Sequence, residues 1–179
     1  MSFIRKRSPE KPVTRYTYNS GPVLFLAQQI CKHMEQQGYP SKIYTHFRSA
    51  KEQHGKFMSG LSKAQPFESP HQIMEAVDIA SAFSPAWPET TDPYWQALKD
   101  ARDIVAKKFG VELTGGFEWG WDLAHIETTD WKETPIYKIN LQLPHSQKRR
   151  PNQDELDARF KEILPKVWKR HTKSVAYFR

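Results

Sequence analysis

Two short segments of the chain carry the side chains best suited to chemistry. The first runs from Ser69 to Asp78 and contains His71, and the second is Asp122-Leu123-Ala124-His125. Their candidates are two imidazoles, His71 and His125, and two aspartate carboxylates, Asp78 and Asp122. Two imidazoles and one carboxylate suit a divalent zinc ion that keeps a fourth position open for water, which is the arrangement of a hydrolase rather than of a structural zinc site. The other carboxylate could then accept a proton from that water.

Spacing alone is weak support for such a site. With 7 His and 8 Asp in 179 residues, chance produces roughly 0.3 His-x6-Asp pairs, and as many Asp-x-x-His pairs. The flanking residues strengthen the pattern, because Ser69 precedes the first of these histidines by two residues, an Ala-x-Asp-Ile run follows, and Trp-Asp-x-x-His-Ile-Glu closes the set.

The stretch from about Lys42 to Glu127 resembles the LAS-type zinc peptidases, a family of D-Ala-D-Ala carboxypeptidases and dipeptidases and phage endolysin L-alanyl-D-glutamate peptidases. The family pattern is Ser-x-His-x-x-Gly-x-Ala-x-Asp, followed by Asp or Glu-x-x-His. The resemblance implies one Zn2+ per chain. It assigns the roles as follows: zinc ligands His71, Asp78 and His125, a catalytic carboxylate at Asp122, and a substrate-contacting or site-shaping hydroxyl at Ser69.

Further residues of the motif are read from the same resemblance. Arg48 and Gln53 match an Arg-Ser...Gln segment, which implies that Arg48 supplies a positive charge near the reacting carbonyl or the substrate carboxylate and that Gln53 binds substrate. Glu127 either orients a ligand imidazole or is an exposed glutamate at a strand end. Met74 departs from the pattern, because the family has Gly there. A requirement for positive φ at this position would strain the local geometry.

The substrate implied by the resemblance is the stem peptide of bacterial peptidoglycan. Thr114-Gly115-Gly116 and Trp119-Gly120-Trp121-Asp122 look more like the endolysin branch, so we prefer an L-alanyl-D-glutamate endopeptidase over a D-Ala-D-Ala carboxypeptidase. Whether the two tryptophans stack on substrate or pack in the core stays open. The alternative function is a non-catalytic virion or wall-binding protein that retains the peptidase fold, which Met74 and the C-terminal segment keep open.

Length and composition predict one domain over 1–179, with an N-terminal arm at 1–20, a zinc peptidase core at 21–130 and a C-terminal extension at 131–179. The net charge of +7 is concentrated near the chain ends and favours anionic partners such as cell-wall polymers. We do not expect nucleic acid as a partner, because no nucleic-acid-binding motif accompanies the charge. We expect a chain made in the cytoplasm without a signal peptide or membrane insertion, acting on the cell wall.

Periodicity predicts the elements that position these residues. We expect helices over 22–37 and 92–109 and from Asn152 to Leu164, a helical turn over 50–59, and strands over 43–47, 75–82 and 136–143. His71 and Asp78 are an odd number of residues apart, so one continuous strand would send them to opposite faces. We therefore place His71 in a loop and Asp78 in a strand, and expect a turn between Asp122 and His125.

The predicted fold class is α+β, with a small, mostly antiparallel sheet flanked by helices and the zinc site at the sheet edge or in a cleft. Cys31 is the only cysteine and is expected to be a small buried apolar residue. The remaining histidines lack paired ligand spacing and are expected on the surface; they are His33, His46, His54, His145 and His171.

Overall fold

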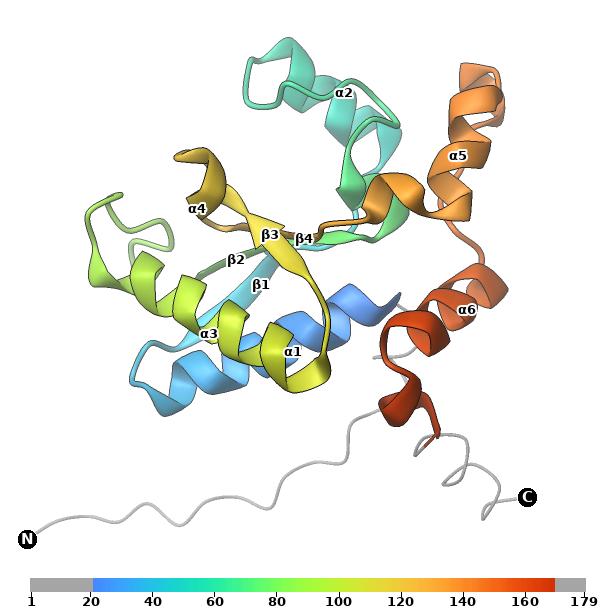
Figure 1. The fold of residues 1–179 in the computed structure, drawn as a ribbon. Coiled ribbons are helices and arrows are strands. Elements are labelled where there is room, and N and C mark those ends of the chain that lie inside the picture. Colours follow the sequence, from blue (N-terminus) through green and yellow to red (C-terminus); the bar gives the residue numbers. More distant parts are fainter. Residues whose placement is uncertain (1–20, 170–179) are drawn as a thin grey trace, which may run out of the picture.

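The computed structural model describes residues 21–169 and shows the expected α+β fold (Figure 1). Its sheet has four antiparallel strands in the order β1-β2-β4-β3. The N-terminal arm and His171 lie outside the described residues. The strands are β1 (Ser41–Thr45), β2 (Ala76–Ser81), β3 (Leu113–Gly115) and β4 (His125–Thr128).

One face of the sheet packs on helices α1 (Gly21–Gln36) and α3 (Pro93–Phe109), which lie below it in Figure 1. Val77, Ile79 and Ile126 point into this core. Side chains alternate along a strand, so the residues between these apolar positions point to the other face. Three of the expected site residues occupy such positions: Asp78, His125 and Glu127.

The opposite face is bordered by shorter elements, which lie above the sheet in Figure 1. They are α2 (Ala50–Met58), the 3-10 turn η2 (Pro70–Ile73), α4 (Gly116–Trp119) and α5 (Pro135–Gln142). Two further 3-10 turns and helix α6 also follow β4: η3 (Trp131–Glu133), η4 (His145–Gln147) and α6 (Gln153–Ile163), and residues 165–169 are helical as well.

Capping residues set the boundaries of helices α3 and α6. Asp92 accepts a hydrogen bond from the Tyr94 N–H at the start of α3, and Gly110 ends that helix in the left-handed conformation with φ 67°. Asn152 begins α6 with a capping box, in which its side chain accepts from the Glu155 N–H and the Glu155 carboxylate accepts in return. Both predicted helices are confirmed.

The strand predicted over 136–143 is wrong, because this segment forms helix α5. Pro135 occupies the first helical turn, where its missing N–H costs nothing. Ile136 and Asn140 are buried one helical turn apart, and the Asn140 amide bonds the backbone of Arg149. The alternating sequence suited a strand equally well, and these tertiary contacts decide for the helix.

The remaining expectations concern single residues. Cys31 packs partly buried against the core, and burial raises its pKa to about 11. His54 and His145 are exposed and His33 is half-buried. His46 corrects the surface prediction, because its Nε2 atom is buried without a hydrogen-bond partner. Within residues 21–169, no helix combines the length and apolar character needed to cross a membrane.

Candidate metal centre

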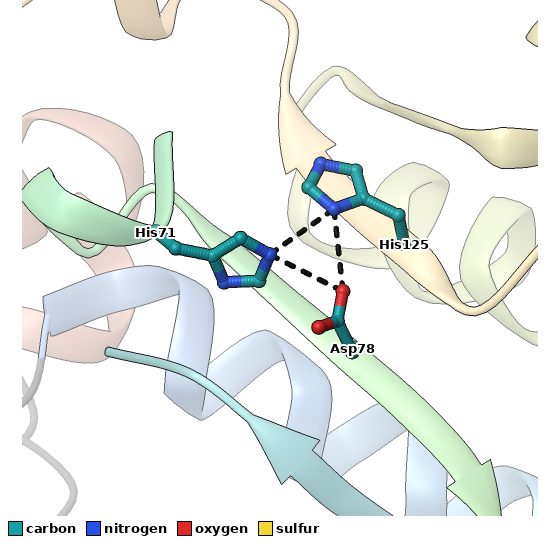
Figure 2. Close-up of side chains that lie close together, drawn as sticks. All are labelled: His71, Asp78 and His125. Carbon is teal, nitrogen blue, oxygen red and sulfur yellow. Dashed lines mark hydrogen bonds and ion pairs between the residues drawn. The ribbon is translucent and has the colours of Figure 1, made fainter. Parts of the chain in front are cut away.

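Three side chains from three separate elements meet on the open face of the sheet (Figure 2). Asp78 and His125 are directly opposite each other in the pairing of β2 with β4, so both side chains rise from the same face. His71 comes from η2, the turn that leads into β2. The sequence-based placement of His71 before the strand and Asp78 within it is confirmed.

The three groups form a nearly equilateral triangle. His71 Nε2 lies 3.2 Å from His125 Nδ1 and 3.2 Å from Asp78 Oδ1, and His125 Nδ1 lies 3.3 Å from the same oxygen. A tetrahedral zinc ion with bonds of about 2.0–2.1 Å holds its ligand atoms about 3.3–3.4 Å apart. All three residues are buried. The triangle therefore has the size and the donor atoms that a tetrahedral metal site requires.

Each imidazole makes a second contact that sets which nitrogen carries the proton. His71 Nδ1 lies 3.1 Å from the backbone oxygen of His46, and His125 Nε2 lies 2.9 Å from Glu127 Oε2. Both partners are acceptors, so each of these nitrogens donates a proton. The other two nitrogens face the centre of the triangle, where each presents a lone pair once its ring is neutral. This is the orientation that binding of one cation needs.

Met74 lies at the turn that brings His71 over the strand. Its φ of 62° and ψ of 29° place it in the left-handed region, which costs a residue with a side chain roughly 1–2 kcal/mol. The requirement for positive φ therefore holds in this chain, with a methionine in place of glycine. The Met74 side chain is buried, with 9% exposure, and this packing offsets the strain. The departure from the family pattern leaves the triangle intact.

Arg48 is a buried cation beside the triangle. Its Nη2 donates to Asp78 Oδ2 at 3.3 Å and its Nη1 donates to Gln53 Oε1 at 2.9 Å, while its Nε is buried without a partner. Gln53 has no exposed surface, and its amide nitrogen donates to Ser62 and to the Ala64 carbonyl. The resemblance implied that Gln53 contacts substrate. The contacts in this structure favour a different role, in which Gln53 positions Arg48.

The charges of the cluster are strongly coupled. Burial alone would raise the pKa of Asp78, but hydrogen bonds from His125 and His71 outweigh it and hold the carboxylate ionised. Burial would likewise lower the pKa of His125, but bonds to Asp78 and Glu127 raise it to about 9. A metal ion must therefore displace a proton from His125 on binding.

Asp122 lies in a strained turn within electrostatic reach of Asp78, His125, His71 and Arg48. Its φ is 53°, and its backbone oxygen accepts from the His125 N–H at 2.9 Å, which confirms the expected turn. Asp122 is exposed, yet the surrounding protein desolvates its carboxylate and raises its pKa, and the charge of Asp78 raises it further. A carboxylate with a raised pKa is suited to exchange protons near neutral pH.

Two glycines allow the Asp122 turn to come this close. A Cβ atom on Gly116 would lie 1.9 Å from the Asp122 carbonyl oxygen, and one on Gly115 would lie 2.1 Å from the His125 oxygen. No real side chain tolerates such contacts. The sequence suggested only that the Gly-Gly pair resembles the endolysin branch. The structure shows that both positions must be glycine because a side chain would overlap the backbone of Asp122 or His125.

Glu127 is buried, with 9% exposure, which excludes the exposed alternative. Its Oε1 accepts from the indole N–H of Trp131 at 2.9 Å while its Oε2 bonds His125. Trp131 belongs to the segment after residue 130 whose role the sequence left open. A buried tryptophan needs an acceptor for its N–H, but nothing in the sequence pointed to Glu127 as that acceptor.

Helix α6 contacts the segment that leads from η2 into β2. Arg159 of α6 is buried and donates to both carboxylate oxygens of Glu75, at 3.1 and 3.2 Å. Glu75 lies between the η2 turn and β2, and its other contact is the Thr128 hydroxyl of β4. The C-terminal segment therefore ties together the two strands that carry Asp78 and His125.

The remaining expected residues lie around the cluster. Ser69 is buried, with 5% exposure, immediately before η2, and it is not one of the three grouped side chains. Trp119 and Trp121 are exposed by 39% and 45%, so neither is a core residue. The ring of Trp119 lies 5.3 Å from that of His125. Of the alternatives left open by the sequence, packing in the core is therefore excluded for both.

No family model matches the sequence, and no curated protein matches it. Among solved structures, the chain is similar to the crystal structure of the Serratia marcescens L-Ala D-Glu endopeptidase ChiX, with a TM-score of 0.52 and 19% sequence identity. The match covers 66% of this chain and 87% of that chain. At this identity the likeness shows a shared fold, in which the His71, Asp78 and His125 cluster is a potential metal site.

Proposed function

We propose that this protein is a zinc-dependent peptidase that hydrolyses the L-alanyl-D-glutamate bond of peptidoglycan stem peptides. The observation that carries the proposal is the triangle of His71, Asp78 and His125, with edges of 3.2–3.3 Å and with His71 Nε2 and His125 Nδ1 directed inward. The shared fold with an L-Ala D-Glu endopeptidase supports the choice of substrate.

The donor set favours zinc among the common divalent ions. Two imidazole nitrogens suit zinc and other transition metals, whereas magnesium and calcium prefer sites built from oxygen atoms. Zinc bound by His71, Asp78 and His125 would act as a Lewis acid, which polarises a carbonyl and makes water more acidic. Three protein ligands leave a coordination position free, as in catalytic rather than structural zinc sites.

The surrounding residues supply the proton transfers and the fixed charge. Asp122 takes a proton from the attacking water and passes it to the leaving amine, for which its raised pKa is suited. Arg48 offsets negative charge that develops on the carbonyl oxygen, an effect that is stronger because this guanidinium is buried. Gln53 and Asp78 hold Arg48 in place for that role.

Purified muropeptides incubated with the zinc-loaded protein test the proposal. Mass spectrometry of the products should show cleavage between L-Ala and D-Glu, and EDTA should abolish it. Asp122→Ala should keep stoichiometric zinc and lose cleavage by several orders of magnitude, since it removes only the proton acceptor. Asp100→Ala, an exposed carboxylate on α3, is the matched control and should behave as wild type.

Two results would contradict the proposal. Loss of a terminal D-Ala from the substrate would identify a carboxypeptidase instead of the endopeptidase. Metal-free protein that binds cell-wall fragments without cutting them would support the alternative, a non-catalytic virion or wall-binding protein with the peptidase fold. The inward orientation of His71 Nε2 and His125 Nδ1, and the presence of Asp122 within electrostatic reach of both rings, favour the enzyme.

A further inference from the structure

Two exposed indoles continue outward from the metal centre. Trp119 and Trp121 keep 39% and 45% of their surfaces exposed. The Trp119 ring centroid lies 5.3 Å from that of His125, and the Trp121 ring centroid lies 5.9 Å from that of Trp119 at an interplanar angle of 39°. We call this pair the indole platform. Contact with His125 accounts for the position of Trp119 but not for that of Trp121.

The indole platform is held by a dedicated support. Helix α4 has only 4 residues and is too short to persist without tertiary contacts. Its Glu118 accepts two hydrogen bonds of 2.7 Å from the buried Arg102 of α3, and a third from the Gly115 N–H. Gly120 then ends the helix with φ 71°, a conformation in which a side chain would be strained.

We propose that the indole platform binds the sugar to which the stem peptide is attached, the N-acetylmuramyl unit of the glycan strand. This inference rests on the proposed function. A pyranose ring presents a face of C–H groups with its hydroxyls at the rim, and the flat indole surface matches that face. The sugar is uncharged once its lactyl carboxylate is amide-linked to the peptide, which suits an aromatic surface.

The position of the platform selects between the candidate bonds. In an L-Ala–D-Glu cleavage only one alanine separates the scissile bond from the lactyl group of the sugar, and one residue spans at most about 3.3–3.6 Å. A substrate seated on the metal centre then holds its sugar near Trp119 and Trp121. At a D-Ala-D-Ala bond four residues intervene, on the order of 13 Å of extended chain. This is longer than the two steps of 5.3 and 5.9 Å from His125 through Trp119 to Trp121, so the sugar would lie beyond both rings.

Lys63 places its ammonium over one face of the Trp121 ring, which leaves the other face of that indole for the sugar. Its ammonium lies 4.8 Å from the ring centroid of Trp121 and comes from the loop between α2 and η2. An ammonium carries three N–H donors, which suit the hydroxyl and acetamido oxygens at the rim of the sugar. Aromatic surface with a few polar groups beside it is the usual composition of a ligand site.

The test compares two substrates that differ only in the sugar. One is the free stem peptide, and the other is the same peptide attached to its disaccharide. We expect the wild-type protein to cleave the disaccharide peptide with at least tenfold higher kcat/KM. In Trp121→Ala this ratio should fall toward one, and in Trp121→Phe it should be partly retained. Ile104→Ala, an exposed apolar residue on α3, should keep the wild-type ratio.

The outcomes separate this inference from the proposed function. Cleavage of both substrates between L-Ala and D-Glu with equal efficiency in the wild type would overturn the sugar site and leave the peptidase intact. A kcat/KM ratio that stays at the wild-type value in Trp121→Ala would also overturn the sugar site. So would a loss of kcat/KM that is equal on both substrates in Trp121→Ala and in Trp121→Phe. No cleavage of either substrate by the zinc-loaded wild type would refute the proposed function, and the sugar site with it.

Discussion

The floor and the rim of the site are built in opposite ways. The floor consists of His71, Asp78 and His125 with Arg48 behind them, all buried on or beside a four-stranded sheet and bonded to one another. The rim, residues 115–122, begins with two buried glycines at the end of β3, and Phe117 packs against the core, whereas the side chains from 118 to 122 are exposed. The floor has the density of a core, and the rim has the exposure of a binding surface.

We infer from this difference that the floor binds the metal and that the rim supplies the groups for substrate binding and proton transfer. Ligand atoms must hold their spacing to within a few tenths of an ångström, and packed strands supply that rigidity. A proton acceptor and substrate-contacting rings must instead remain accessible to incoming molecules. We therefore expect changes in the floor to remove the metal, and changes in the rim to spare the metal and reduce turnover.

The largest effect is expected from Asp78→Ala. It removes one metal ligand and also leaves the buried Arg48 with only Gln53 as a partner. Breaking a buried ion pair in this way costs about 3–5 kcal/mol. Zinc content and the free energy of unfolding should both fall, while His54→Ala, an exposed histidine on α2, changes neither. Full zinc occupancy in Asp78→Ala would contradict the assignment.

A rim change should have a different signature. Gly116→Ala puts a Cβ atom 1.9 Å from the Asp122 carbonyl oxygen, so the turn must move and carry the Asp122 carboxylate away. We expect kcat to fall by roughly 100-fold or more, with zinc content unchanged. Gly55→Ala is the control, because α2 has open space there and alanine should stabilise the helix by about 0.5–1 kcal/mol. An unchanged kcat in Gly116→Ala would contradict the claim that glycine at this position is needed to place Asp122.

Glu127→Gln tests the support beneath the floor. The carboxylate accepts from both His125 and Trp131, and an amide can accept only through its single oxygen. Loss of such a partner typically weakens metal binding by about 10–100-fold. Competition with a zinc chelator measures the zinc affinity of the Glu127→Gln variant. Trp131→Phe removes only the indole donor and should lower the zinc affinity by a smaller factor.

The smallest expected effect is a dependence on pH. The pKa of His125 is about 9 in the metal-free fold, above its ordinary value of 6.5. Its contribution to stability is therefore fully present below pH 6.5 and is lost as pH rises through 9. Metal-free protein should unfold more easily at pH 9 than at pH 7, whereas zinc affinity should rise over the same interval. Chemical denaturation at both pH values, with and without zinc, measures these changes. Metal-free protein that is more stable at pH 9 than at pH 7 would contradict the prediction.

Local patterns were sufficient to predict the parts of the molecule whose causes are local. Helices α3 and α6 follow from their caps and apolar spacing, and the parity of the His71 to Asp78 spacing predicted a turn followed by a strand. Segment 136–143 failed because its alternation fits either a strand or a helix, and only its packing decides.

The supporting residues could not be predicted, because they act across long stretches of chain. Arg159 bonds Glu75 from 84 residues away, and the backbone oxygen of His46 bonds the His71 ring from 25 residues away. Trp131 reaches Glu127 over 4 residues, but only a bend after β4 directs the indole to it. Such partners have no preferred spacing in the sequence, so no periodicity reports them.

By itself, the sequence determined which side chains are available for a metal, because imidazoles and carboxylates at these spacings can lie on one face of a strand and its preceding turn. Only the tertiary structure decided that their donor atoms lie 3.2–3.3 Å apart, that Glu127 is buried against Trp131, and that two tryptophans stay exposed beside them. The reason is physical: residue type sets the chemistry of a side chain, whereas distance, burial and exposure arise from packing between distant segments.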